Sequence, residues 1–255
     1  MSAYREIYYV FDKPVPYKSL LIYPVKVQDY YELATYISCL MIEKNSIRDP
    51  ILAMKAISMS YLRYMYENSN SENQYIQLFN ALLRLVLQLE EGEEIKYGYK
   101  ENEEPYFRIK NIEYYSGDFD EIRKIISEQN MIDLPNEKIQ KDVREALEKA
   151  KRFKERLNKN KTASFEEQMI ALSIYSGLSM ETIYGMTYRK FTMAIRRANQ
   201  IIMSGLYLNA HLTGFSTFKD KSILKSWIAD LNEDDKYSDV KIDSEDLRGK
   251  VSGNK

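Results

Sequence analysis

The side chains that most often carry chemistry are scarce in this sequence. His211 is the only histidine and Cys39 the only cysteine among 255 residues. A Ser–His–Asp or Cys–His catalytic unit would have to use His211, which lies in the segment LNAHLTGF with no nucleophile motif beside it. A structural zinc site needs about four cysteine or histidine ligands. We therefore expect neither nucleophilic catalysis nor structural zinc, and we interpret His211 as a structural or surface histidine.

Carboxylates are the remaining candidates for a metal site or an acid–base site. The densest local cluster contains Glu233, Asp234, Asp235 and Asp239, but it lacks the alternating Asp/Asn pattern and the turn glycine of a calcium loop. The nine glycines form no GxGxxG motif and no P-loop. We expect no metal, no cofactor and no catalytic residue, and a carboxylate-based enzyme is the least favoured alternative.

Composition narrows the class of protein further. Lys and Arg number 37 and Asp and Glu 38, and this balance argues against a chain devoted to coating nucleic acid or an anionic membrane. One cysteine cannot form an internal disulfide. The sequence begins without the basic-then-apolar pattern of a signal peptide, and no run of about 20 apolar residues is present to span a membrane. We expect a soluble cytoplasmic protein that makes no use of a membrane.

Periodicity indicates a mostly α (α+β) fold, with an N-terminal part over residues 1–133 that carries a small β-hairpin or sheet on helices. The clearest helix covers residues 72–90, because large apolar side chains recur there at helical spacing: Tyr75, Leu78, Phe79, Leu82, Leu85, Val86 and Leu89. The other predicted elements of this part are an extended segment over 6–27, helices over 28–44 and 51–67, a β-hairpin over 94–115 and a helix N-capped by Asp118.

The rest of the chain is predicted to be helical. Residues 134–160 are expected to form a charged helix or linker, with a partner-binding coiled coil as the alternative. Residues 161–231 are expected to form a C-terminal helical part. Residues 232–255 are polar, which is typical of a disordered tail.

Capping signals divide the C-terminal helical part. A capping box that begins at Ser164 starts one helix, and Gly177 ends it. Ser179 caps a second helix, which the spacing of apolar residues extends to about Asn209. Gly185 is expected to bend this second helix.

The second of these helices carries four basic residues, Arg189, Lys190, Arg196 and Arg197, within an arc of about 120° on a helical wheel. Segment 166–198 loosely resembles the helix-turn-helix of sigma-like regulators, whose second helix enters the major groove. Nucleic-acid binding through this basic face is the alternative function, and a solvated amphipathic face is the simpler interpretation.

Two stretches carry a family resemblance. The first is FDKPVPYKSLLIYPVKVQDYYEL, in which a proline-rich lead is followed by a short strand ending in IYPV and by VQDYYE at the start of a helix. The second is MTYRKFTMAIRRANQII, followed by a Trp-containing segment. Together these stretches are similar to phage tail-morphogenesis proteins, namely tail assembly chaperones and baseplate-hub assembly proteins of phages that infect Gram-positive hosts.

The resemblance implies a non-enzymatic virion or tail assembly factor that acts by protein–protein binding. Its partner would be a phage structural protein such as a tape-measure, tail or baseplate subunit, and its location the host cytoplasm or the virion. A chaperone of this kind covers the apolar stripes of a long helical protein with its own helical grooves. Aromatic anchors commonly dominate such contacts, so we predict the partner-binding residues to be Phe215, Phe218, Leu224, Trp227 and Ile228, with ordinary core residues as the alternative.

Overall fold

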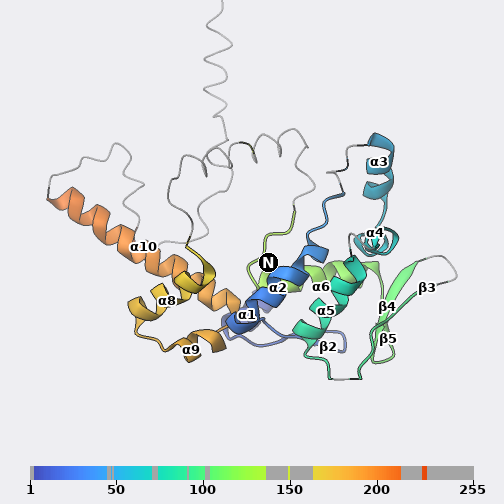
Figure 1. The fold of residues 1–255 in the computed structure, drawn as a ribbon, viewed down its shortest axis with the longest axis horizontal. Coiled ribbons are helices and arrows are strands. Elements are labelled where there is room, and N and C mark those ends of the chain that lie inside the picture. The colour runs from blue at the N-terminus through green and yellow to red at the C-terminus, as the bar shows by residue number, and fades with distance from the viewer. Residues whose placement is uncertain are drawn as a thin grey trace, which may run out of the picture. The chain divides into compact units, whose positions relative to one another are not determined.

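The computed structural model describes residues 3–44, 47, 49–70, 74–90, 92–100, 104–135, 149, 163–213 and 226–228. These residues form helices and two small antiparallel sheets (Figure 1), which confirms the mostly α (α+β) fold. The elements of the N-terminal part are α1 (Ala3–Val10), β1 (Val15–Tyr17), β2 (Leu20–Ile22), the short 3-10 helix η1 (Val27–Asp29), α2 (Tyr30–Tyr36), η2 (Ile37–Leu40), α3 (Pro50–Ser58), α4 (Tyr61–Asn68), α5 (Tyr75–Leu87), β3 (Lys96–Tyr99), β4 (Pro105–Ile109), β5 (Ile112–Tyr114) and α6 (Ser116–Gln129).

Three further helices follow, α8 (Phe165–Ser176), α9 (Met180–Gly185) and α10 (Tyr188–Leu212). The chain divides into two compact units. The first contains Met1–Lys141 and Phe165–Met193, and the second contains Asp142–Ser164 and Ala194–Lys255.

This division differs from the boundaries placed on the sequence at residues 133 and 160, because α8 and α9 belong to the same unit as the N-terminal part. The physical reason is an aromatic cluster that the sequence did not reveal. The ring of Tyr30 stacks on Phe165 with 3.8 Å between centroids and lies 5.3 Å from the ring of Tyr188. Nearly all of predicted linker 134–160 and all of tail 232–255 lie outside the described residues.

The first predicted extended segment is wrong at its start, where the chain forms helix α1. Arg5 and Tyr9 lie one helical turn apart and both reach α6. The Arg5 guanidinium pairs with Glu121, and the Tyr9 hydroxyl donates to the carboxylate of Glu128 at 2.9 Å. These tertiary contacts override the strand propensity of the aromatic and β-branched residues. The second half of the segment is extended as predicted, with β1 and β2 paired antiparallel.

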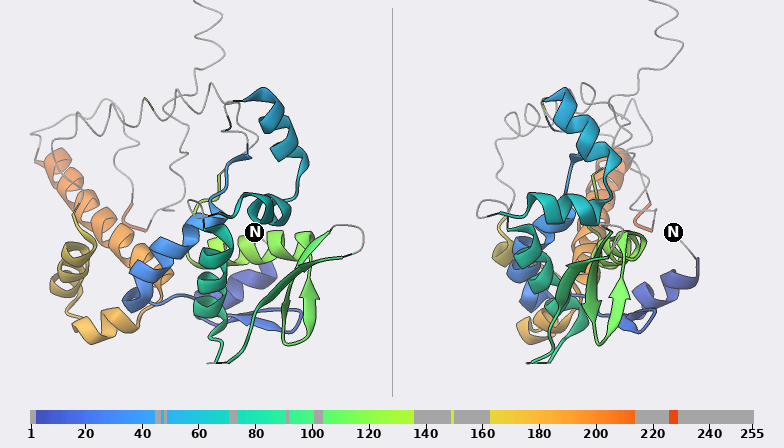
Figure 2. Two further views of the ribbon diagram at one scale, coloured as in Figure 1. Left: turned by 45° about the vertical axis from the view of Figure 1, so that its right-hand side comes forward. Right: turned by 90° about the vertical axis from the view of Figure 1, so that its right-hand side faces the viewer.

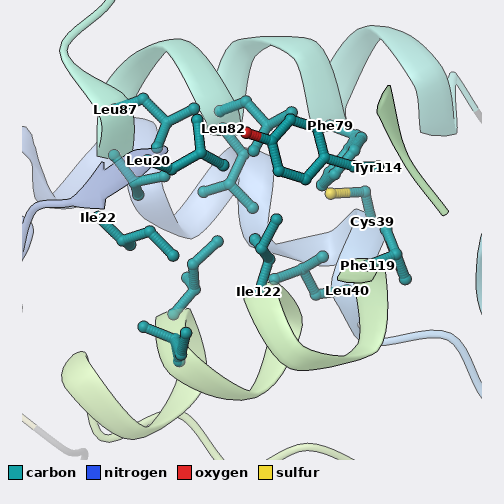
Figure 3. Packing of buried hydrophobic residues seen from close by; sticks show 14 of the residues in the cluster. Leu20, Ile22, Cys39, Leu40, Phe79, Leu82, Leu87, Tyr114, Phe119 and Ile122 are labelled. Carbon is teal, nitrogen blue, oxygen red and sulfur yellow. The ribbon is translucent and has the colours of Figure 1, made fainter. Parts of the chain in front are cut away.

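The hydrophobic core of the first unit lies between α5 and α6. Figure 3 shows side chains from these two helices pointing toward one another, with residues of β2 and η2 between them. Phe79 of α5 is fully buried, and its ring lies 5.0 Å from the ring of Phe119 and 5.4 Å from the ring of Phe107. The predicted helix over 72–90 is thus confirmed, and its apolar stripe faces the core.

The predicted hairpin is confirmed and extended by one strand. β3 pairs with β4, and β4 pairs with β5, so the sheet is a three-stranded antiparallel meander. A hairpin over 94–115 would contain a single returning strand. Lys110 and Asn111 instead take positive φ angles of 49° and 65°, the left-handed geometry of a tight hairpin turn.

α6 begins with a capping box, but Asp118 is not its N-cap as predicted. Tyr115 is the N-cap, and Asp118 occupies the third helical position. The Asp118 carboxylate accepts hydrogen bonds from the Tyr115 amide at 2.9 Å and from the Tyr17 hydroxyl at 2.7 Å. It also forms an ion pair with Lys18 at 2.5 Å. Asp118 therefore joins the helix start to the β1–β2 turn.

The predicted helix from residue 180 to about 209 is interrupted in the structure. Ser179 caps α9 as predicted, accepting from the Thr182 amide at 3.2 Å, but α9 ends at Gly185 and α10 starts at Tyr188. The intervening residues pair with the chain before η1. The Val27 amide donates to the Met186 carbonyl at 2.9 Å, and the Tyr188 amide donates to the Val25 carbonyl at 2.8 Å. This strand-like pairing replaces helical hydrogen bonding at Met186 and Thr187.

Candidate interaction surface

The sequence of α3 is well suited to begin a helix. The Asp49 carboxylate accepts hydrogen bonds from the amides of Ile51 at 2.8 Å and Leu52 at 3.1 Å, and Pro50 occupies the first helical position. Both features stabilise a helix N-terminus, where backbone amides have no partner within the helix. Residue Met59, at ψ 151°, leaves helical geometry and ends α3.

The side chains of α3 are unusual because they are apolar and exposed. The exposed fractions are 79% for Ile51, 56% for Leu52, 75% for Met54 and 56% for Ile57. Figures 1 and 2 show α3 beyond α4, away from the helices that enclose the core. A helix that is apolar all round is normally buried. The four side chains therefore represent apolar surface that the described residues of the first unit leave exposed.

Buried polar contacts connect the residues that precede α3 with those that follow it. Lys44 precedes α3, and its ammonium donates to the carbonyl of Met59, which follows α3, at 2.8 Å. Lys44 is 5% exposed, although lysine is seldom buried. The Ser116 hydroxyl, at the start of α6, donates to the Ser60 hydroxyl at 2.9 Å. We call these contacts, together with those of Tyr61 below, the base of α3.

Tyr61 completes the base through cation–π contacts. The Lys44 ammonium lies 4.1 Å from the centroid of the Tyr61 ring, and the Arg123 guanidinium lies 3.9 Å from it. Arg123 is 6% exposed and donates from Nε to the Leu40 carbonyl at 2.8 Å. Desolvated cation–π contacts contribute about 2 kcal/mol or more. The apolar helix is therefore presented on a well-anchored base.

The partner-binding residues predicted from the sequence are only partly described. Phe215, Phe218 and Leu224 lie outside the described residues. Trp227 and Ile228 belong to the second unit and are 57% and 68% exposed. The Trp227 carbonyl accepts a hydrogen bond from Arg197 at 2.6 Å. Exposure of Trp227 and Ile228 is compatible with a contact role, which remains a prediction.

Two of the four predicted nucleic-acid-binding residues are engaged within the first unit. Arg189 donates to the Glu128 carbonyl at 2.9 Å, and the Lys190 ammonium pairs with Asp12 at 2.5 Å. Arg196 and Arg197 belong to the second unit, where Arg196 is exposed and Arg197 bonds Trp227 as described. The basic face of the alternative function is thus partly committed to intramolecular contacts.

The single histidine and the single cysteine lie in different surroundings. His211 is exposed on α10, whereas Cys39 is fully buried, and burial raises the pKa of its thiol, which makes it a poor nucleophile. Among the described residues, no three His, Cys, Asp or Glu side chains converge to hold a metal ion. Within the same ranges, no helix has the length and apolar character to cross a bilayer.

A shallow depression of about 260 Å³ lies beside β3 and β4. Its lining includes the ion pair between Lys110 and Glu93 at 2.9 Å, and the Glu93 carbonyl accepts from Arg84 at 2.7 Å. Hydrogen bonding to Lys110 lowers the pKa of Glu93, so this carboxylate is ionised and paired. Lys96 pairs with Glu94 and Arg108 with Glu113, so the charged side chains that line the depression are already paired within the chain.

Sequence analysis predicted a helix over 51–67 but missed the exposed arm within it. The available signal was the segment PILAMKAIS, in which only Lys55 and Ser58 are polar, so no polar face lies opposite the apolar residues. Such a segment is normally interpreted as core. A single sequence does not show whether its apolar residues are buried in the chain's own core or exposed for a partner. No family model, curated protein or solved structure matches this chain, so its function has to be inferred from the surfaces that it exposes.

Proposed function

We propose that this protein is a non-enzymatic assembly factor that acts by protein–protein binding, with α3 as a docking arm that enters an apolar groove of its partner. The observation that carries the proposal is the exposure of four large apolar side chains on one nine-residue helix. Burial of each such side chain contributes about 1.5–3 kcal/mol, so α3 gains substantially from a partner's groove.

The base of α3 supports the same proposal. An apolar helix on a loose tether would lose conformational entropy on docking, and that loss would offset the gain from burial. The hydrogen bond from Lys44 to Met59 joins the residues before and after α3. The cation–π contact between Tyr61 and Arg123 links this point to α6. The arm is therefore partly ordered before it binds.

The resemblance to phage tail-morphogenesis proteins gives the proposal its context. It favours a phage structural protein as the partner, such as a tape-measure, tail or baseplate subunit, and the host cytoplasm or the virion as the location. A long helical partner offers grooves between its helices that accept a short apolar helix.

Co-expression tests the proposal directly. The chain is produced together with one candidate tail, baseplate or tape-measure protein at a time, and complex formation is measured by size-exclusion chromatography. The double variant Ile51→Ser with Met54→Ser is expected to stay folded, because both side chains are exposed, and to lose the complex. Leu21→Ser, at a side chain that is 48% exposed on β2, is the matched control and should retain it.

Two results decide against the arm. A complex that survives Ile51→Ser with Met54→Ser excludes α3 as the contact, and its loss in Trp227→Ala would move the contact to the predicted C-terminal residues. If no tail, baseplate or tape-measure protein forms a complex with the wild-type chain, the assembly function itself is rejected.

A further inference from the structure

Helix α8 has a second apolar face that its own packing does not use. Met169 and Leu172 are buried and form the inner face. On the opposite face, Ile170 and Ile174 lie one turn apart and are 44% and 81% exposed. A helix of 12 residues presents this face over about 18 Å.

The outer face of α8 is framed by acidic residues. Glu166 and Glu167 are exposed and lie one turn before Ile170 and Ala171, on the same side of the helix. α9 adds Glu181, which is also exposed; hydrogen bonds from its own amide and from Ser179 lower its pKa and keep it ionised. From Phe165 to Tyr188 the sequence contains these three glutamates and no Lys or Arg.

This charge pattern decides between two kinds of partner. In a helix-turn-helix, the second helix carries donors and positive charge toward the DNA. α9 is six residues long and contains Glu181 but no basic residue. The next cations in the chain, Arg189 and Lys190, contact Glu128 and Asp12. The glutamates of α8 and α9 would repel the phosphates of DNA, whereas they would attract a basic polypeptide.

We infer that the outer face of α8, formed by Glu166, Glu167, Ile170 and Ile174, binds a basic amphipathic helix of a partner protein. The partner's apolar residues, at helical spacing, cover Ile170 and Ile174, and its Lys or Arg residues flank that stripe and pair with the glutamates. This surface goes beyond the proposed docking arm, because it is on a different helix and its partner is specified by charge as well as by apolar contact.

Binding of a synthetic peptide to the full-length chain tests the inference. The probe is a labelled helical peptide of about 18 residues with Leu at helical spacing and Lys elsewhere, and the comparison peptide has Glu in place of Lys. Fluorescence anisotropy is expected to show binding of the Leu/Lys peptide only, weakening as salt rises. Duplex DNA, tested in parallel, is expected not to bind to α8 and α9.

Variants locate the binding face. Ile170→Ser with Ile174→Ser should weaken binding of the Leu/Lys peptide by about tenfold or more, since each tenfold corresponds to about 1.4 kcal/mol and two apolar contacts are lost. Glu166→Lys should also weaken it. Glu94→Lys, at an exposed position in the loop before β3, makes the same change in net charge and should leave binding unaltered. Ile51→Ser with Met54→Ser should also leave it unaltered, which separates this face from the docking arm.

Several results would overturn the inference. These are equal binding of the Leu/Glu peptide, no binding of the Leu/Lys peptide, or equal losses from Glu166→Lys and Glu94→Lys. Sedimentation velocity adds a further check, because self-association that disappears in Ile174→Ser would identify a second copy of this chain as the occupant instead. Thermal unfolding confirms that each variant is folded.

Discussion

Helices α5 and α3 are both rich in apolar residues, yet one forms the core and the other stands exposed. In α5, polar residues such as Gln77, Asn80 and Arg84 recur on one side, so the apolar side chains define a single face. In α3, the apolar residues surround the helix and only Lys55 and Ser58 are polar. A one-sided pattern tells a helix how to pack against its own chain, whereas an all-round pattern does not.

The comparison also shows what determines burial. Phe79 of α5 is enclosed because Phe107 and Phe119 come from elements that pack on both sides of it. The base of α3 is held by polar contacts, and its exposed side chains do not pack against the described elements of the core. Hydrophobicity supplies the driving force for burial, but chain connectivity decides whether a neighbour is available.

The largest effect is expected in the core. Phe79→Ala should lower the free energy of unfolding by about 3–5 kcal/mol, because it removes a fully buried ring and leaves a cavity between α5, β4 and α6. Urea denaturation measures the change. A loss similar to that of a surface substitution would break the distinction between the two helices.

The base of α3 should be the next most sensitive region. Arg123→Ala removes the hydrogen bond to the Leu40 carbonyl and the contact with the Tyr61 ring, and it should cost about 2–3 kcal/mol of unfolding free energy. Arg63→Ala is the control, because its ion pair with Glu67 at 2.7 Å lies at the surface, where such pairs contribute about 0–1 kcal/mol. Equal losses in the two variants would show that the base is not a special anchor.

Acid should weaken the first unit through Asp118. Burial alone would raise the pKa of Asp118, but the bonds from Lys18, Tyr17 and the Tyr115 amide outweigh it and lower the pKa. A carboxyl whose pKa is lower in the folded state stabilises the fold above its unfolded pKa of about 3.9, and this contribution is lost as pH falls through the lowered value. The stability difference between wild type and Asp118→Asn should be constant above about pH 5 and shrink below about pH 4. Chemical denaturation over this range measures it, and a difference that grows in acid would contradict it.

The smallest effect on stability is expected on the arm. Met54→Ala should change the free energy of unfolding by less than about 0.5 kcal/mol, because the side chain is 75% exposed. The same substitution should reduce the binding of a fluorescent dye that reports exposed apolar surface. A stability loss comparable with that of Phe79→Ala would mean that α3 packs against the chain in solution, which would remove the docking arm.

Several features of the fold were predictable because their causes are local. The stripe of α5 repeats every three or four residues, Ser179 is a good N-cap, and alternation around a polar turn identified β3 and β4. The family resemblance stays a prediction, because no known protein matches the chain. The predicted contact at Phe215, Phe218 and Leu224 also stays a prediction, because these residues lie outside the described ranges.

Other features depend on partners that are distant along the chain. α1 is helical because Arg5 and Tyr9 meet Glu121 and Glu128, more than a hundred residues away, and a propensity scale does not include such contacts. The candidate site was also missed, because an all-round apolar segment such as that of α3 is normally core and its pattern does not say whether another element covers it.

By itself, the sequence determined the mostly helical fold, the main core helix and the scarcity of groups arranged for catalysis, because period and composition are properties of neighbouring residues. Only the tertiary structure decided that α8 and α9 join the N-terminal unit and which apolar side chains remain exposed on α3 and α8. Exposure is a property of what packs against a side chain, and those neighbours are set by contacts between distant segments.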